Sequence, residues 1–368
     1  MRVTLLSKAL VVGAYQRKCE LIAAHPDIEL TVLVPSAWGK QHLERAHTNG
    51  YDLRVIPIRF NGNFHLHHYP TLADELKRSQ PDVLHIDEEP YNLATWLAMR
   101  SLSLRERARV RGLFFSWQNI SRTYPLPFRW MEHDVLHKAD AAIVGNREAE
   151  AVWRAKGFAR EIHFIPQFGV DEGVFTPSPF EGEGWGEGVT LGYFGRLVHE
   201  KGVDILLHAL AHLPSHVNAL IVGNGDQESI LKSLAQELGV TDRITWRAQV
   251  PSTDMPALYQ KLDALVLPSR TLPNWKEQFG RVLIEAMACG VPVIGARSGE
   301  IPNVIGDAGL LFDEGDATQL VEAINMLIAQ PDLGDEFARK GRTRVLEHFT
   351  MQRIADQTVE VYRRLTRV

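Results

Sequence analysis

The sequence predicts an α/β protein with two doubly wound parallel-sheet domains. At 368 residues, the chain is too long for one comfortable hydrophobic core, so two domains are expected. Short apolar runs alternate with helical patterns through both halves, which is typical of parallel sheets. Several of these runs are continuously apolar rather than alternating, as expected for strands that helices cover on both faces. Two such domains would face each other across a cleft.

Both halves repeat this rhythm of strand and helix. In the first half the predicted strands are 3–6, 30–34, 55–58, 83–86, 112–115, 141–144 and 162–165. In the second half they are 191–194, 219–222, 244–246, 264–267 and 291–294, with helices such as 203–213 and 227–238 between them. A final helix is predicted over 351–365.

A stretch rich in proline, glycine and acid marks the predicted domain boundary. Residues 177–179 read Pro-Ser-Pro, and 181–188 are almost entirely Glu and Gly, without apolar periodicity. Residues 1–167 carry 22 Lys and Arg against 18 Asp and Glu, whereas the remainder carries 18 against 27. The predicted domains are an amino-terminal domain over 1–175, a linker over 176–188, a carboxyl-terminal domain over 189–349, and a helix over 350–368 that can cross back to the first domain.

Composition excludes several classes of protein. The formal net charge of −5 argues against a nucleic-acid-binding protein. No apolar run reaches the roughly 18 to 20 residues that a membrane-spanning helix needs. Lys8 interrupts the opening residues before they form an apolar segment long enough for a signal peptide, so a strand is predicted there instead. With only Cys19 and Cys289, no disulfide framework is expected, and the expected compartment is the cytoplasm.

Two loops of the second half follow predicted strands and carry groups suited to a phosphate. Arg196 and Lys201 lie between a strand and a helix, where a guanidinium fork and a compact ammonium can bind phosphate. Two solvated loop cations are the simpler alternative. The turn Gly223-Asn224-Gly225 follows the next strand and lets backbone approach a ligand. Because Glu228 stands where a third glycine would complete the dinucleotide fingerprint, a nicotinamide dehydrogenase is disfavoured.

The stretch from Glu277 to Val293 is the most informative segment. A helix is predicted to begin near Gly280, and its first N–H groups, through Val282, would form an anion site that the helix dipole reinforces. Glu277 precedes this helix and can hydrogen-bond hydroxyls of the molecule that carries the anion. Glu285, two turns along, can reach a second polyol part. An acidic helix start with one surface glutamate is the alternative interpretation.

These motifs resemble the donor domain of family 4 glycosyltransferases, which are retaining, group 1 type enzymes with the GT-B fold. In that fold, two Rossmann-like domains face each other across a cleft. The similarity runs through roughly residues 140 to 368. The matching blocks are 195–202, 221–225, 277–293 and 298–302, together with 165–171 at the domain boundary.

The resemblance implies roles for particular residues. Arg196 and Lys201 match the residues that hold the donor's diphosphate, and Glu277 matches the acid that orients hydroxyls of the transferred sugar. Glu285 matches the residue that bonds the nucleotide ribose. Further donor contacts are implied at Gly195, Gly223, Arg247, Val250, Phe279, Gly280, Arg281 and Val282, and at Gly13, which lets the amino-terminal domain close on the diphosphate.

The first half departs from the family pattern. Family members commonly carry a histidine in the loop after the strand that corresponds to 112–115, whereas this chain has Gln118 and Asn119 there. Gln118 can donate and accept hydrogen bonds but cannot titrate, so a histidine general base is not expected at this place. Gln118, Asn119 and His133 are predicted to lie near the sugar or the acceptor.

No metal or cofactor is expected. His133 and His137, like His208 and His212, have helical spacing, but no acid or cysteine completes a metal site. The sequence has no Asp-x-Asp motif, and residues 87–89, Asp-Glu-Glu, are the nearest approach. The charges of Arg196 and Lys201 would replace that of a metal ion.

The basic run Arg100–Arg111 suggests one further partner. In family 4, basic amino-terminal surfaces often touch anionic membranes, so peripheral membrane contact at the inner face is one interpretation and a solvated surface is the other.

The predicted activity is transfer of a hexosyl group, with retention, from a UDP- or GDP-sugar to a hydroxyl of a saccharide, a lipid-linked acceptor or a small molecule. A nucleotide-sugar epimerase or phosphorylase on the same fold is one alternative. A non-catalytic sugar-nucleotide binding protein is the other, although the acid and both cations are present.

Overall fold

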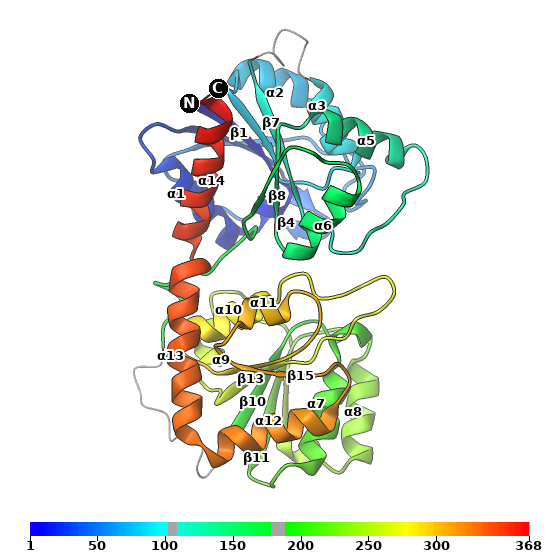
Figure 1. Cartoon of the computed structure of the whole chain (residues 1–368), viewed down its shortest axis with the longest axis vertical. Helices are drawn as coiled ribbons and strands as arrows, with labels where there is room; N and C mark the ends of the chain where they lie inside the picture. Colours follow the sequence, from blue (N-terminus) through cyan, green and yellow to red (C-terminus); the bar gives the residue numbers. More distant parts are fainter. Residues whose placement is uncertain (102–108, 178–187, 368) are drawn as a thin grey trace. The chain divides into compact units, whose positions relative to one another are not determined.

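The chain forms two compact α/β units, each built on a parallel sheet (Figure 1). The computed structural model describes residues 1–101, 109–177 and 188–367. Unit 1 comprises Met1–Phe168 and Met351–Val368, and unit 2 comprises Gly169–Thr350. The predicted class of two doubly wound parallel sheets is confirmed. The division between the units precedes the predicted linker 176–188, most of which lies outside the described residues.

Unit 1 contains a seven-stranded parallel sheet with the strand order β5-β2-β1-β6-β7-β8-β9. Its strands are β1 Arg2–Leu6, β2 Glu29–Pro35, β5 Asp52–Ile56, β6 Val83–Ile86, β7 Arg111–Ser116, β8 Ala141–Val144 and β9 Glu161–Phe164. A small hairpin of β3 Ala37–Trp38 and β4 Gln41–His42 was not predicted. The strand predicted over 55–58 ends at Ile56, because Pro57 has no N–H to continue the ladder.

Helices cover both faces of this sheet. They are α1 Arg17–Ala23, α2 Leu72–Ser79, α3 Leu93–Ser101, α5 Phe128–Lys138, α6 Arg147–Ala155 and α14 Met351–Thr366, with 3-10 turns at Ala9–Val11 and Gly13–Gln16. Along β2, Val32 and Val34 join one hydrophobic cluster and Leu33 joins the other. Successive side chains point to opposite faces, so a continuously apolar strand is what two covered faces require.

The last helix, α14, belongs to unit 1 although it follows all of unit 2 in sequence. It packs against α1 (Figure 1). Ile354, Ala355 and Val359 are fully buried, and Tyr362 donates or accepts a hydrogen bond of 2.7 Å with Nδ1 of His85 on β6. The end of the chain therefore completes the core of the unit in which the chain begins.

Unit 2 contains a six-stranded parallel sheet with the order β12-β11-β10-β13-β14-β15. Its strands are β10 Val189–Phe194, β11 Val217–Val222, β12 Ile244–Arg247, β13 Ala264–Leu267, β14 Val293–Ala296 and β15 Leu310–Phe312. β15 was not predicted. The strand predicted over 291–294 begins only at Val293, because the N–H of Val291 bonds the carbonyl of Ala286 and Pro292 has no N–H.

The helices of unit 2 alternate with its strands. They are α7 Val203–His212, α8 Glu228–Glu237, α9 Met255–Tyr259, α10 Arg281–Ala288, α11 Ile301–Ile305, α12 Ala317–Ala329 and α13 Pro331–His348, with 3-10 turns at His199–Lys201 and Thr241–Arg243. In both units, the connections run to one side of the first strand and then restart on its other side. This reversal is the switch point at which open α/β sheets bind ligands, beyond the carboxyl ends of the strands.

Shortening Ile354 should destabilise the protein. Ile354→Ala leaves a cavity where a fully buried side chain packs, so the free energy of unfolding should fall by about 2–5 kcal/mol in urea denaturation of unit 1. Arg367→Ala, at an exposed position near the end of the chain, is the control and should leave it within about 0.5 kcal/mol. Equal midpoints for both variants would contradict the packing of α14.

Candidate active site

The polar residues of unit 2 gather where β10 and β13 end side by side. β10 pairs with β11 on one side and with β13 on the other, so its carboxyl end lies at the switch point of the sheet. The loop after β10 carries Arg196 and Lys201, and the loop after β13 carries Ser269 and Glu277. Strand order therefore brings together two loops that are about 70 residues apart in sequence.

Lys201 and Glu277 form an ion pair across this point. Nζ of Lys201 lies 2.6 Å from Oε2 of Glu277, and Oγ of Ser269 donates a hydrogen bond of 2.9 Å to the same oxygen. The Lys201 and Glu277 side chains are only 16% and 9% exposed, and the Lys201 ammonium also lies 5.1 Å from the ring of Trp275. The pair places a positive charge and an oriented carboxylate at the carboxyl ends of the central strands β10 and β13.

A glycine allows the neighbouring loops to meet. Gly223 has φ of +151°, and a Cβ there would lie 1.8 Å from the carbonyl oxygen of Gly195. Its N–H also donates to the carbonyl of Arg247, at the end of β12, over 2.9 Å. Any side chain at position 223 would push apart the loops that follow β10 and β11.

Helix α10 begins directly after the loop that carries Glu277. Gly280 precedes it in the left-handed conformation, with φ of +81°, and the helix runs over Arg281–Ala288. The predicted helix start near Gly280 is confirmed. Glu277 thus lies just before the positive end of this helix, beside the Lys201 ammonium.

Glu285 lies deeper in the same unit than the sequence alone suggests. It is 3% exposed, and its carboxylate accepts a hydrogen bond of 2.7 Å from the Tyr259 hydroxyl and pairs with Nε of Arg281 at 2.6 Å. An ionised carboxylate has about four lone-pair positions, so these two contacts leave acceptor capacity. Burial is the main reason, and the negative charge of Glu285 the second, that the pKa of Tyr259 lies well above its usual range. The phenol therefore stays protonated and remains a donor.

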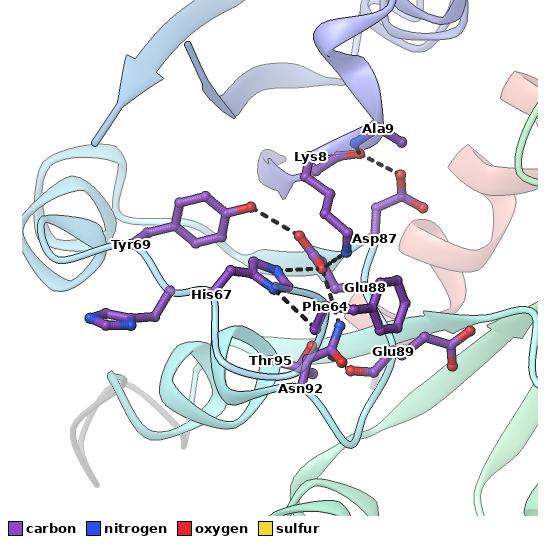
Figure 2. A network of polar contacts seen from close by, with 12 residues as sticks. Lys8, Ala9, Phe64, His67, Tyr69, Asp87, Glu88, Glu89, Asn92 and Thr95 are labelled. Atoms are coloured by element: carbon purple, nitrogen blue, oxygen red, sulfur yellow. Dashed lines mark hydrogen bonds and ion pairs between the residues drawn. The ribbon is translucent and has the colours of Figure 1, made fainter. Parts of the chain in front are cut away.

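Unit 1 carries a second polar cluster at its own switch point, between β1 and β6 (Figure 2). Glu88, directly after β6, pairs with the ammonium of Lys8, from the loop after β1. Oε2 of Glu88 also lies 2.9 Å from Nε2 of His67, and Oε1 accepts a hydrogen bond of 2.9 Å from the Tyr69 hydroxyl. All four residues are at least nine-tenths buried.

The three consecutive carboxylates after β6 have three different environments. Burial alone would raise the pKa of Glu88, but Lys8 and His67 lower it to about 2. Burial raises the pKa of Glu89 to about 7, even though its oxygens accept from Oγ of Ser116 at 2.6 Å and from the N–H of Trp117 at 2.7 Å. Two neighbouring glutamates, Glu88 and Glu89, therefore have pKa values on opposite sides of the usual glutamate value.

Asp87 is the third of these carboxylates and the one open to a further partner. Its Oδ2 accepts a hydrogen bond of 2.7 Å from the Ser7 hydroxyl. Its Oδ1 is buried and has no hydrogen-bond partner among the described residues. A buried acceptor without a partner costs free energy, so Asp87 is a candidate to bind a hydroxyl of a ligand.

Sequence and structure comparisons point to one family. Residues 180–344 match the family model described as glycosyl transferases group 1. The chain is 30% identical over 352 residues, 90% of this chain and 88% of the relative, to a GDP-mannose-dependent alpha-(1-6)-phosphatidylinositol monomannoside mannosyltransferase of Mycolicibacterium smegmatis. It is 26% identical over 381 residues, covering 93% and 95%, to N-acetyl-alpha-D-glucosaminyl L-malate synthase of Bacillus anthracis.

The chain belongs to the group 1 glycosyltransferases.

Solved structures agree on the fold of this glycosyltransferase. Sucrose-phosphate synthase from Thermosynechococcus elongatus aligns with a TM-score of 0.76 at 22% identity over 99% of each chain. Anabaena HepE in complex with UDP aligns with a TM-score of 0.75 at 19% identity, again over 99% of each chain. The fold is GT-B, as the sequence motifs predicted.

Other predicted donor contacts of the glycosyltransferase occupy varied surroundings. The Arg196 side chain is 65% exposed and lies 3.7 Å from Glu200. Phe279 is buried against Phe349, with ring centroids 5.7 Å apart. Arg247 ends the edge strand β12, and Val250 lies half-buried in the loop that follows. Their roles toward a donor stay predictions.

The residues predicted near the sugar or the acceptor lie in unit 1. Gln118 and Asn119 are buried in the loop after β7, where Nε2 of Gln118 donates to the carbonyl of Ile120. His133 is exposed on α5, and its ring centroid lies 4.1 Å from that of His137, with the two rings tilted by 54°. The N–H of Gly13 donates to Oε2 of Glu44 at 2.7 Å, so a diphosphate at this N–H would have to displace that carboxylate.

The basic run Arg100–Arg111 is not one uniform patch in the described part of the chain. Arg100 pairs with Asp134 at 3.5 Å, and Arg111 pairs with Asp140 at 3.5 Å. Arg105 and Arg107 lie outside the described residues. Among the helices that the structure describes, none has the length and apolar character to cross a bilayer.

Three of the residues at the unit 1 switch point were not predicted as site residues: Lys8, Asp87 and Glu88. A signal for them exists in the sequence, because three acids directly follow the buried strand 83–86. The sequence relates these acids to a metal-binding motif only. No cluster of three potential metal-binding side chains occurs in residues 1–101, 109–177 and 188–367.

Breaking the Lys8–Glu88 pair should destabilise the enzyme. Glu88→Gln leaves the Lys8 ammonium buried without its counter-charge, so the free energy of unfolding should fall by about 3–5 kcal/mol at neutral pH in urea denaturation. The double variant Lys8→Met/Glu88→Gln removes both charges and should recover part of this loss. If the double variant loses more unfolding free energy than the two single variants lose together, the pairing is contradicted.

The same variant has a defined pH dependence. The pKa of Glu88 is lowered to about 2 in the folded state, below the usual value of about 4.3 for an unfolded glutamate. Its stabilising contribution is therefore complete above about pH 4.5 and disappears as the pH falls toward 2. The stability difference between wild type and Glu88→Gln should shrink over this window.

Proposed function

We propose that this protein transfers a hexosyl group from a UDP- or GDP-sugar to a hydroxyl acceptor with retention at the anomeric carbon. The observation that carries the proposal is the Lys201–Glu277 pair at the switch point of unit 2, just before α10 begins. The relatives support a nucleotide-sugar donor, because one is named as GDP-mannose-dependent and a structural neighbour was solved with UDP.

The geometry suits the charge that develops as a glycosidic bond to a diphosphate breaks. The Lys201 ammonium, the Arg196 guanidinium and the N–H groups of Gly280–Val282 would stabilise the departing diphosphate. No reorganisation of Lys201 is needed, since its pairing with Glu277 already holds it in place. The Arg196 side chain is exposed and would have to order on the ligand.

Glu277 and Glu285 would contact the two polyol parts of the donor. The carboxylate of Glu277, fixed by Lys201 and Ser269, would accept hydrogen bonds from hydroxyls of the transferred sugar. Glu285 would use its remaining acceptor capacity for the ribose, and the segment from Arg247 to Val250 would contact the base. Gly195, Gly223, Phe279 and Arg281 complete the proposed donor site.

Unit 1 would hold the acceptor side of the reaction. Asp87 offers a buried acceptor oxygen, and Gln118 and Asn119 lie in the loop after the adjacent strand β7. Attack would occur on the same face that the diphosphate leaves, and the leaving phosphate oxygen would take the proton of the acceptor hydroxyl. Lys201 and Arg196 supply the positive charge for this chemistry, so no divalent ion is part of the proposal.

Removing either member of the unit 2 pair should abolish most of the activity. Lys201→Ala and Glu277→Ala should each lower kcat/KM for transfer at least about a hundredfold, the order expected for one preorganised electrostatic contact. Lys232→Ala removes an exposed lysine of the same unit that pairs with Glu228, and it should retain wild-type activity. Wild-type turnover in Lys201→Ala or Glu277→Ala would overturn the site assignment.

The donor can be identified by thermal stabilisation. A nucleotide sugar that binds only the folded protein must raise Tm, by an amount that grows with its concentration over Kd. A panel of UDP- and GDP-sugars should contain one that raises Tm in wild type and fails to do so in Lys201→Ala. NMR of the product should then show the anomeric configuration of the donor. Nucleotide release or sugar conversion without a new glycoside would favour a phosphorylase or an epimerase instead.

A further inference from the structure

Unit 1 contains a cavity of about 580 Å³ that no step above uses. It is bounded by residues 121–123 and Leu126 of the loop after β7, by one side of α5 from Arg129 to Leu136, and by Lys156 at the end of α6. A volume of this size is within the range of small-molecule sites. The side chains that matter for its chemistry are Arg122, Leu126, Arg129, Trp130, His133 and Lys156.

The cavity carries an excess of positive charge. Glu132 is the acid among its lining residues, and Lys156 neutralises it through an ion pair of 2.5 Å in which both side chains are largely buried. Arg122 and Arg129 are exposed and line the cavity with two further guanidinium groups. Guanidinium groups suit a phosphoryl group, which accepts bidentate hydrogen bonds, and two of them line this cavity.

One side of the cavity is apolar and exposed. Leu126 is 77% exposed and Trp130 is 48% exposed, although both are large hydrophobic residues. Trp130 is held in place by Trp96, with ring centroids 5.1 Å apart, and by the Arg100 guanidinium at 5.8 Å. An ordered, half-exposed indole beside two arginines offers apolar contact next to an anion site.

The cavity adjoins the carboxyl end of the unit 1 sheet. Nζ of Lys156 lies 5.2 Å from the ring of Tyr124, which stacks on Tyr91 at 4.3 Å. Tyr91 follows the carboxylates that end β6, and Lys156 is close enough to Glu89 to lower its pKa against the effect of burial. The cavity therefore lies on the ligand-binding side of this sheet.

We propose that this cavity binds a phosphoryl or diphosphate group of the acceptor, with Arg122 and Arg129 on the anion and Leu126 and Trp130 against the apolar group attached to it. That the bound anion belongs to the acceptor rests on the proposed function, whereas the binding of the anion itself does not. Sugar phosphates and lipid diphosphates share the phosphoryl chemistry, and they differ in whether the apolar side is used.

The test uses three probes on the full chain: inorganic pyrophosphate, glucose 1-phosphate and geranyl diphosphate. Binding is measured by calorimetry to wild type, Arg122→Gln/Arg129→Gln and the matched control Lys77→Gln/Arg78→Gln, which removes two exposed cations from α2 of the same unit. The cavity variant should bind the phosphoryl probes at least about tenfold more weakly, and the control should bind as wild type does.

Further variants separate the parts of the cavity and the two proposals. If the acceptor is a lipid diphosphate, Trp130→Ala should weaken geranyl diphosphate roughly tenfold while pyrophosphate stays within about twofold. If it is a sugar phosphate, glucose 1-phosphate should bind best and Trp130→Ala should matter little. Lys201→Ala changes only the donor site of unit 2. If phosphoryl probes still bind to Lys201→Ala, and this binding depends on Arg122 and Arg129, the cavity is an anion site even if the proposed function fails.

Two outcomes would overturn the proposal. One is equal affinity of the cavity variant and the α2 control for all three probes. The other is arginine-dependent binding to phosphatidylglycerol vesicles, but not to phosphatidylcholine vesicles, without binding of any soluble probe, which would make the arginines a membrane-contact surface. Arg129→Glu, which reverses one exposed charge, repeats the test if the double variant unfolds, and it should weaken pyrophosphate at least as much.

Discussion

A buried or nearly buried lysine–glutamate pair bridges the switch point of the sheet in each unit. In unit 1, Lys8 follows β1 and Glu88 follows β6; in unit 2, Lys201 follows β10 and Glu277 follows β13. In both cases the lysine comes from the loop after the first strand, and the glutamate comes from the loop after the strand that starts the second half of the sheet. Removing two charges from water is costly, so such pairs are weak evidence for stability by themselves. Their value here is that they hold two loops in one arrangement.

This arrangement determines which polar groups remain for chemistry. In unit 2, the pair presents a carboxylate and an ammonium at the start of α10, where a helix dipole adds positive potential. In unit 1, Glu88 pairs with Lys8, and Oδ1 of Asp87 is buried without a hydrogen-bond partner among the described residues. Burial raises the pKa of Glu89 to about 7. Neighbouring residues of the same chemical type thus acquire different roles from their surroundings alone. The cavity beside α5 continues this polar edge with arginines rather than acids.

Prediction from sequence succeeded where the relevant residues are close together in the chain. The stretch from Glu277 to Glu285 contains a loop acid, a left-handed glycine and a helix start, and each has a local signature. The central strands of both sheets were recognised because burial on both faces demands continuous apolar runs. The β3–β4 hairpin and the three-residue strand β15 escaped prediction because they are too short to show a period. The residues of the unit 1 cluster escaped because Lys8, His67 and Glu88 come from three separate segments.

The sequence by itself determined the fold class and the family resemblance, and it identified the candidate acids and cations of unit 2, because these depend on local periodicity and contiguous motifs. Only the tertiary structure decided which lysine pairs with which glutamate, since pairing depends on strand order. Strand order brings together residues that are 80 positions apart in unit 1 and 76 apart in unit 2. It also decided that α14 returns to unit 1, and that Arg122, Arg129 and Lys156 surround one cavity. Burial and neighbouring charge, which set the ionisation of Glu88 and Glu89, exist only after the chain has folded.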